Sequence, residues 1–473
     1  MVIPSSSNPR ESLLVFSDVH LGSDVNDRPT TELIRRSSRI DADLAELLRH
    51  YAEQKPSGDR WRLVIAGDFI DFIGMVVDDP KNEELTSEER EHGLGNSSEH
   101  ARIKLRRVAE RHTDVFEALA EFVARGHALT LVHGNHDVEF HWDDVKKDFR
   151  EYLFQHAGDV DRAEFLARIE FNPWFFYWGT VAYIEHGHQY DSFCATDHII
   201  APVSPLDPRR VARGFSDTLL RFVVRPTRGM REHGHEQLGI TDYLAFGAKL
   251  GLSGMLALLT RYVRAVVELF KLRRLHFSEA AKALREEHER RKALFGEASR
   301  IGMDRIRALA ALQVPPLTRS IHGIMASLLL DRLALGLMAS LLLVTFGILC
   351  AYQSHFFYAC LAVIVAWLVA HRHLTKLRHV DAADEMSIRA GHLAKLLPAA
   401  FVVMGHTHTP ATTPINDGAS TYINLGSWAE EEPGESAQSY TAARTHLVIH
   451  VENGEPRAEL LAWDSTTGPK RFR

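Results

Sequence analysis

Five short polar clusters recur along the chain, each starting within two residues of the end of an apolar run. The apolar runs are 13–16, 63–66, 129–132, 181–184 and 401–404. The clusters are, in order, Asp18-Val19-His20, Gly67-Asp68, Gly134-Asn135-His136-Asp137, His186-Gly187-His188 and Gly405-His406-Thr407-His408. Short apolar runs that end at glycine and polar residues are typical of buried strands. The repeated pattern predicts an α/β fold with these polar side chains at its strand ends.

The residue types in the clusters are those of metal ligands. Carboxylates and imidazoles without cysteine suit Mn²⁺, Fe or Zn²⁺ better than a closed structural zinc site. Asp18 and His20 are two residues apart in an extended segment and so share one face, as do His406 and His408. Asp68, alone after a glycine, is placed to bridge two ions. Two ions about 3.5–4 Å apart hold a hydroxide and stabilise both oxygens of a phosphoryl displacement, so the pattern predicts dinuclear hydrolysis of phosphate esters.

These motifs resemble those of the calcineurin-like metallophosphoesterases, over roughly residues 12–195 and 396–465. The resemblance implies a four-layer αββα sandwich and two divalent metal ions, with Mn preferred and Fe or Zn as alternatives. It also implies a ligand set for each ion. One ion is expected to be bound by Asp18, His20 and His408, the other by Asn135, His186 and His406, with Asp68 bridging both.

The same resemblance implies roles for two residues that are not ligands. His136 is expected to face the phosphate and either stabilise the transition state or protonate the leaving oxygen. Asp71 stands where related phosphatases place an acid that orients this histidine, although it is alternatively a surface carboxylate. His188 and Asp191 are candidates for substrate contact or for support of the ligands. His133 is expected to pack or to support the loop.

The order of elements also favours a layered α/β fold. Strands are expected near 12–17, 62–67, 128–133, 174–185, 399–404, 421–425, 444–451 and 458–463. Helices are expected near 31–55, 98–126 and 141–157. We expect three segments: a first part of the core at 1–195, a helical insertion or cap at 196–395, and a second part of the core at 396–473.

The insertion contains three polar or amphipathic stretches. Residues 205–232 are rich in arginine, which is typical of a solvated helix face, an anion-binding cap or a contact with anionic lipid. Those arginines are Arg209, Arg210, Arg213, Arg221, Arg225, Arg228 and Arg231. Residues 240–275 predict an amphipathic helix that lies in a membrane interface or packs on its neighbours. Residues 278–312 predict a long charged helix, most simply a solvated arm.

A membrane hairpin is predicted over residues 333–370. Leu333–Tyr352 holds twenty residues without a charge, which is the length that crosses about 30 Å of hydrocarbon. A second apolar run, Phe356–Ala370, is shorter and implies tilt, thinning or a re-entrant path. Arg332 precedes the pair and Arg372 and Lys376 follow it, so both ends are expected in the cytoplasm. The competing interpretation is a buried helical hairpin in a soluble domain.

Composition limits the compartment and the partners. The formal net charge of −7 argues against a nucleic-acid binder, since phosphate neutralisation needs clustered basic surface. The three cysteines suggest no disulfide pattern, and the N-terminus has no apolar signal-peptide core. We therefore expect an inner or plasma membrane protein with a cytoplasmic catalytic part, or a cytoplasmic protein if the hairpin is not inserted.

Among the branches of the family, the chain is most similar to the UDP-2,3-diacylglucosamine diphosphatase type. The similarity rests on Ser17-Asp18-Val19-His20-Leu21, on Gly67-Asp68-Phe69-Ile70-Asp71 and on the cap. That branch usually has arginine at His136 and an acid at His188. The expected function is hydrolysis of a lipid- or nucleotide-linked phosphodiester or pyrophosphate. The alternatives are a membrane-tethered phosphatase or nuclease acting on a soluble substrate, and a non-enzymatic scaffold.

Overall fold

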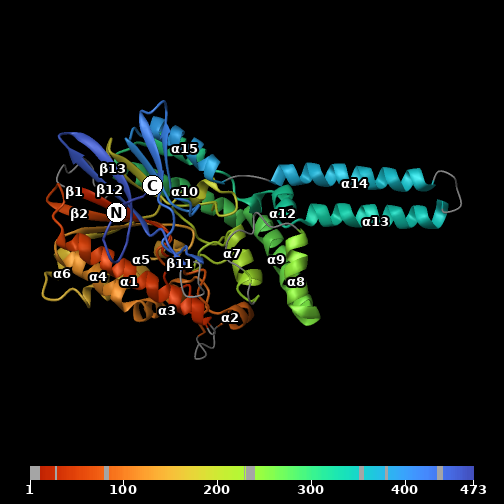
Figure 1. Cartoon of the computed structure of the whole chain (residues 1–473), viewed down its shortest axis with the longest axis horizontal. Helices are drawn as coiled ribbons and strands as arrows, with labels where there is room; N and C mark the ends of the chain where they lie inside the picture. The colour runs from red at the N-terminus through yellow and green to blue at the C-terminus, as the bar shows by residue number, and fades with distance from the viewer. Residues whose placement is uncertain are drawn as a thin grey trace. The chain divides into compact units, whose positions relative to one another are not determined.

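The computed structural model of the chain describes most of its length. The described residues are 11–26, 29–78, 85–227, 230, 240–350, 356–378, 382–433 and 440–472. They fall into two compact units, which are described separately (Figure 1). Unit 1 comprises Met1–Arg213, Ser278–Pro315 and Ala382–Arg473, and unit 2 comprises Gly214–Phe277 and Pro316–Asp381. These boundaries differ from the three expected segments, whose status as domains stays a prediction.

Unit 1 is built on two β-sheets. The larger sheet has the strand order β14-β13-β12-β1-β2-β3-β4, and the smaller one β5-β6-β7-β9-β8. In the larger sheet, β1 (Glu11–Phe16), β2 (Arg60–Ala66), β3 (Ala128–Val132) and β4 (Ile169–Asn172) are parallel. In the smaller sheet, β6 (Ala182–Glu185), β7 (Phe401–Met404) and β9 (Ser420–Asn424) are parallel. Both sheets therefore direct several strand ends toward one edge.

The remaining strands run antiparallel to their neighbours. In the larger sheet they are β12 (Thr445–Glu452), β13 (Glu455–Ala462) and β14 (Lys470–Arg471). In the smaller sheet they are β5 (Phe175–Trp178) and β8 (Ala411–Ile415). A separate pair is formed by β10 (Glu432–Pro433) and β11 (Tyr440–Thr441).

Alternation of side chains along the strands explains how the two sheets pack. Leu13 and Val15 of β1 point to one face, where they share a buried cluster with Ile184 of β6 and Val403 of β7. That cluster is the core between the sheets. Phe16 of β1 points to the other face and joins a second buried cluster. Strands buried on both faces need apolar residues at successive positions, which is why the runs found in the sequence are continuous.

Helices cover the outer face of each sheet (Figure 1). On the larger sheet lie α1 (Thr31–Glu53), α3 (Ser98–Arg111), α4 (Thr113–Ala124) and α5 (Asp143–Phe154). On the smaller sheet lie α10 (Glu279–Ser299), α11 (Met303–Leu312) and α15 (Ala382–Leu396). Two shorter helices, α2 (Ser87–His92) and α6 (Arg162–Ala167), complete the unit's α-helices among the described residues. The expected mixed α/β class with two sheets is confirmed.

Several expected elements differ from those observed. The single strand expected at 174–185 is an antiparallel pair, β5 and β6, because residues 179–181 form a turn. The helix expected at 98–126 is divided at His112 into α3 and α4. The expectation of a solvated arm at 278–312 is wrong. This segment forms two helices, α10 and α11, whose residues Phe295 and Ile306 are buried against the smaller sheet.

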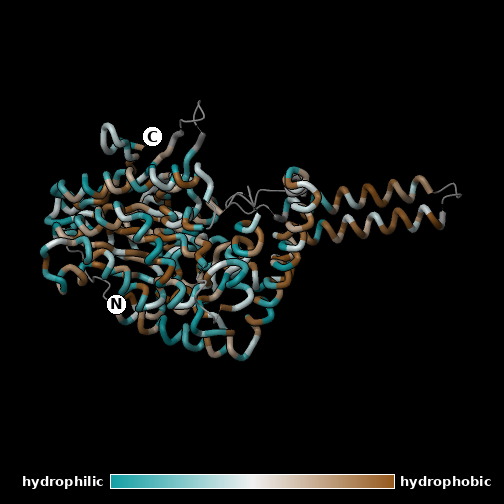
Figure 2. The backbone as a smooth tube through the Cα atoms, turned by 90° about the horizontal axis from the view of Figure 1, so that it is seen from below, coloured by the Kyte–Doolittle hydropathy of each residue, from teal (hydrophilic) through white to brown (hydrophobic). Residues whose placement is uncertain are grey.

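Unit 2 is helical. It contains α7 (Phe215–Leu219), a π-helical turn at Leu220–Val224, α8 (Ile240–Lys249), α9 (Gly251–His276), α12 (Ile321–Ser327), α13 (Leu330–Cys350) and α14 (Phe356–Arg378). Helices α13 and α14 lie side by side in both views, and Figure 2 colours them mostly hydrophobic. Their segments Leu330–Ile348 and Phe356–Lys376 are long and apolar enough to cross a membrane. Of the residues singled out in the sequence, Arg228, Arg231 and Tyr352 lie outside the described part.

Candidate metal centre

All five polar clusters stand at the carboxyl ends of parallel strands. The first three follow β1, β2 and β3 of the larger sheet, and the last two follow β6 and β7 of the smaller sheet. The Nδ1 atom of His186 donates to the carbonyl of Ala66 at 3.0 Å, which joins the end of one sheet to the end of the other. The two sheets therefore bring clusters far apart in sequence to one place.

The backbone at this place is strained. Five of the seven expected ligands adopt the left-handed conformation, with φ between 52° and 68°; they are Asp18, His20, Asp68, His406 and His408. Residues other than glycine rarely adopt this conformation unless the surrounding structure enforces it, and such strain concentrates at functional sites. These backbone conformations therefore lower the stability of the fold, and they fix the direction of the five side chains.

Two of the motif glycines are required by close approach. A Cβ atom on Gly134 would lie 2.0 Å from Oδ1 of Asp68, and one on Gly405 would lie 2.3 Å from Oδ2 of Asp18. Each glycine thus lets one loop pass directly over a carboxylate of another loop. This explains in physical terms why glycine precedes Asn135 and His406.

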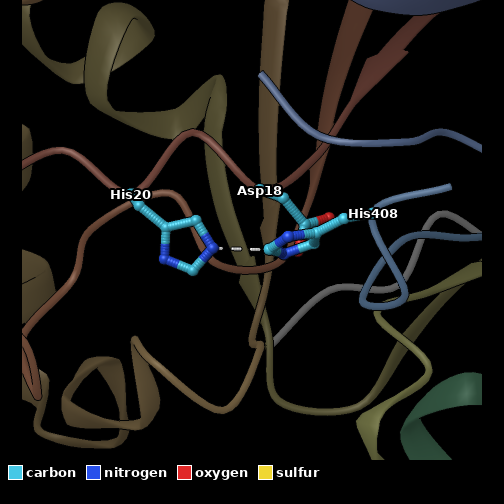
Figure 3. A group of neighbouring side chains, drawn as sticks. All are labelled: Asp18, His20 and His408. Atoms are coloured by element: carbon cyan, nitrogen blue, oxygen red, sulfur yellow. Dashed lines mark hydrogen bonds and ion pairs between the residues drawn. The ribbon is translucent and has the colours of Figure 1, made fainter. Parts of the chain in front are cut away.

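Asp18, His20 and His408 form one candidate ligand group (Figure 3). Nε2 of His408 lies 3.1 Å from Oδ1 of Asp18, and Nε2 of His20 lies 3.9 Å from the same oxygen. Nδ1 of His408 lies 3.0 Å from Glu430, which holds the ring with Nε2 toward Asp18. His20 and Asp18 are buried, so the group is largely shielded from solvent.

A second candidate group surrounds Asp68 and His186. Nε2 of His186 lies 3.1 Å from Oδ2 of Asp68 and 3.2 Å from Oδ1 of Asn135. Oδ2 of Asp68 also lies 3.8 Å from Nε2 of His20, so this carboxylate stands between the two groups. That position is the one expected of a bridging ligand.

His406 adjoins the second group. Its ring centroid lies 5.2 Å from that of His186, and its backbone N–H donates to Oδ2 of Asp18 at 3.1 Å. Nε2 of His406 lies 3.1 Å from Oδ2 of Asp191, whose other oxygen accepts the N–H of Phe193 at 2.9 Å. Asp191 thus holds Nε2 of His406 and fixes the orientation of the ring.

His136 and Asp71 lie beside the two groups. Nδ1 of His136 is 2.7 Å from Oδ1 of Asp71, and the His136 ring meets that of His20 edge-on at 4.6 Å. The backbone N–H of His136 donates to Oδ1 of Asp68 at 2.8 Å. The structure therefore brings the seven expected ligands, His136 and Asp71 into one connected site.

The charges in the site suit bound cations. Burial opposes ionisation of Asp68, but the positive charges of His186 and His136 hold the pKa of this carboxyl well below its usual range. Burial also opposes ionisation of Asp18, but His186 and His408 outweigh this effect and lower the pKa of the Asp18 carboxyl. Both carboxylates are thus charged at neutral pH in a buried place. Carboxylate and imidazole donors with this charge fit borderline divalent ions such as Mn²⁺, Fe²⁺ or Zn²⁺.

Other residues considered in the sequence have supporting positions. His133 is buried, and its ring centroid lies 6.3 Å from that of Phe140. Burial lowers the pKa of His133 well below the usual value, so its ring is neutral. His188 is buried with its ring centroid 5.4 Å from that of His186 and 6.4 Å from that of His406. Asp137 accepts the N–H groups of Gly134 and Phe69 at 2.6 and 2.9 Å, which ties two loops together.

Sequence reasoning missed Glu430, which holds the ring of His408. The only local signal for it is its place in an acidic run, Glu430-Glu431-Glu432, shortly after the Leu425–Trp428 segment that closes the core. Of the arginines in 205–232, three pair with acids of unit 1: Arg209 with Asp207, Arg210 with Glu89 and Arg213 with Glu88. Those three therefore form ion pairs within unit 1.

Comparison with known families agrees with this geometry. Residues 12–221 match the family model of the calcineurin-like phosphoesterases, which supports assignment to that superfamily. The family is typically dinuclear and hydrolyses phosphate esters in a metal-dependent way, and the match together with the candidate ligand groups supports a phosphoester hydrolase. The matched stretch ends before His406 and His408, which the fold nevertheless brings to the site. No curated protein matches the chain significantly.

Proposed function

We propose that this chain is a membrane-bound metallophosphoesterase that hydrolyses a phosphodiester or pyrophosphate in a lipid- or nucleotide-linked substrate. One observation carries the hydrolytic part: the convergence of two charged carboxylates, Asp18 and Asp68, with the imidazoles of His20, His186 and His408 within 4 Å. Carboxylate and imidazole donors that converge in this way form a donor set that binds divalent ions in proteins.

The proposed ligands are those expected from the sequence. Asp18, His20 and His408 would hold one ion, Asn135, His186 and His406 would hold the other, and Asp68 would be shared between them. Two divalent ions supply Lewis acidity for the phosphoryl oxygens and lower the pKa of a nucleophilic water. Mn²⁺ is the preferred metal, with Fe or Zn²⁺ as alternatives.

His136 is the proposed catalytic residue of the protein itself. Asp71 holds its Nδ1, which fixes the orientation of the ring and places Nε2 on the ring's other edge. From there, a protonated Nε2 donates its proton to the departing oxygen, or hydrogen-bonds a phosphoryl oxygen as charge develops. Asp71 acts through His136 as a positioning residue.

The membrane location rests on unit 2. Helices α13 and α14 are antiparallel, and the guanidinium of Arg332 donates to the carbonyl of Leu374 at 3.1 Å, so the charged ends of both helices lie together. Large apolar side chains along both helices are exposed, among them Leu337, Leu341, Val344, Phe357 and Val369. A buried soluble hairpin would cover them. By the positive-inside rule, the charged end with Arg332, Arg372 and Lys376 faces the cytoplasm.

A substrate presented at the bilayer follows from this location and from the resemblance to the UDP-2,3-diacylglucosamine diphosphatase type.

The hydrolytic activity is tested with bis(p-nitrophenyl) phosphate and detergent-purified full-length protein that is stripped of metal and then given Mn²⁺. We expect turnover that depends on Mn²⁺ and is lost in Asp68→Asn, whereas the exposed helix cap variant Asp161→Asn keeps it. Turnover in metal-free protein, or full activity of Asp68→Asn, would contradict the proposal.

A further inference from the structure

Helix α9 of unit 2 exposes an apolar face. Five large residues spaced three or four positions apart have exposed fractions between 47 and 72%: Leu252, Leu256, Leu259, Val263 and Val267. This spacing puts them on one side of a helix. We call this set the α9 stripe. A helix on a water-facing surface normally shows polar residues there, so the stripe reverses the expected pattern.

The opposite side of α9 packs inside unit 2. Ala265 is buried in a cluster with Phe222 and Val223 of the π-helical turn. The guanidinium of Arg264 lies over the ring of Phe222 at 5.2 Å. The α9 stripe is therefore a second apolar face, separate from the one that the fold of the unit uses.

The charges of α9 favour an anionic surface. Within Gly251–His276 there are five lysines and arginines and one acid, Glu268. Lys271 and Arg274 follow Val267 by four and seven positions, so cations continue the stripe at its carboxyl end. A helix with an apolar face and flanking cations lies in the boundary between headgroups and acyl chains and prefers anionic lipid.

The stripe is also continuous with the candidate membrane spans. The hydroxyl of Tyr262, in the middle of α9, donates to the carbonyl of Leu328, two residues before α13 begins. Within unit 2, α9 runs across the direction of α13 and α14 (Figure 1). If the two long helices cross a bilayer, a helix tied to their base in this direction lies along its surface.

We propose that the α9 stripe is seated in the surface layer of an anionic bilayer, next to the base of the α13–α14 hairpin. The inference rests on the proposed membrane location of the hairpin and is independent of the catalytic part. The seat holds α9 parallel to the membrane, and the hairpin supplies the anchor across it.

The test uses full-length protein reconstituted in vesicles of phosphatidylcholine and phosphatidylglycerol that carry a clickable acyl chain. A photo-crosslinking benzoylphenylalanine replaces Leu259 in the stripe, Leu341 in α13, or Leu206 in unit 1. Leu206 is the matched control, because it is also a highly exposed leucine, with an exposed fraction of 71%. We expect lipid adducts at 259 and 341 and none at 206.

Each other outcome overturns the inference in a distinguishable way. Adducts at 341 without adducts at 259 leave the hairpin in the membrane and remove the α9 seat. Crosslinks from 259 to protein, either within the chain or to a second copy, assign the stripe to a protein contact. Loss of lipid adducts at both 259 and 341 removes the membrane location altogether. Hydrolysis of bis(p-nitrophenyl) phosphate in the same samples reports separately on the catalytic proposal.

Discussion

The Nδ1 atom of His136 lies 2.7 Å from Oδ1 of Asp71, and the same oxygen accepts the backbone N–H of Gly74 at 2.7 Å. Both side chains are buried. A carboxylate held in this way fixes the orientation of the imidazole and stabilises its protonated form, and it does so without touching the substrate.

Replacing Asp71 with asparagine tests this relationship. We expect kcat to fall about 10- to 100-fold, which is typical when a group that orients an active-site residue is changed. The bound metal content should not change, and the pH–rate profile should move because the imidazolium loses its partner. In the double variant Asp71→Asn with His136→Asn, the second change should add little, since the two residues act as one unit. An unchanged pH–rate profile in Asp71→Asn would remove this role.

The partners of the two C-terminal histidines predict separate effects on the two ions. Asp191 holds His406, and Glu430 holds His408. Asp191→Asn should lower the affinity for the ion bound by His406 by about 10- to 100-fold. Glu430→Gln should lower the affinity for the ion bound by His408 in the same way. The Glu430 effect should be the smaller, because its side chain is 47% exposed and water can replace it. Metal titration followed by calorimetry measures this; if both variants weakened the same ion, the division of ligands would be wrong.

The strand ends of the site were predictable because their signals are local. A buried parallel strand must be apolar at successive positions, and the turn after it needs glycine and polar residues, so β1, β2, β3 and β7 were found close to their observed bounds. Strands without such a run were missed. β8 contains exposed threonines and Pro414 at a sheet edge, and β4 is only four residues long.

Contacts between distant segments were not predictable. His406 and Asp191 are 215 residues apart in sequence, and no local pattern links them. The pairing of His408 with Glu430 depends on how the loop after β9 returns to the site. The many charged residues of α10 and α11 obscure the apolar pattern in the sequence. Phe295, Ile306 and Leu309 are nevertheless buried, and their burial makes these helices part of the core.

The membrane hairpin predicts how the protein fractionates. Full-length protein should stay in the membrane pellet after alkaline carbonate extraction and be released by detergent. Leu341→Arg should weaken insertion, since an arginine near the centre of a spanning helix costs about 2.5–3.5 kcal/mol. Leu206→Arg, an equivalent change in unit 1, should leave the pellet fraction unchanged. Recovery of wild-type protein in the soluble fraction without detergent would contradict the spanning interpretation.

A buried histidine that is not one of the candidate ligands predicts a pH dependence of stability. Burial lowers the pKa of His446 to about 3, and its Nε2 lies 2.8 Å from the hydroxyl of Tyr51. In the unfolded chain the pKa returns to about 6.5, so as pH falls below 6.5 the unfolded state binds a proton that the folded state does not. Between pH 7 and 5, this linkage costs the wild-type protein about 2 kcal/mol of unfolding free energy.

His446→Gln removes the linkage but keeps a group that can accept the hydrogen bond from Tyr51. The variant should melt at a lower temperature than wild type at pH 7. The difference in Tm should shrink at pH 5, because only the wild-type protein is destabilised by protonation of His446 in its unfolded state. Other histidines titrate equally in both proteins and cancel in the comparison. Melting of the two detergent-purified proteins at both pH values is the measurement. A difference in Tm that stays constant would mean that His446 is already protonated in the fold.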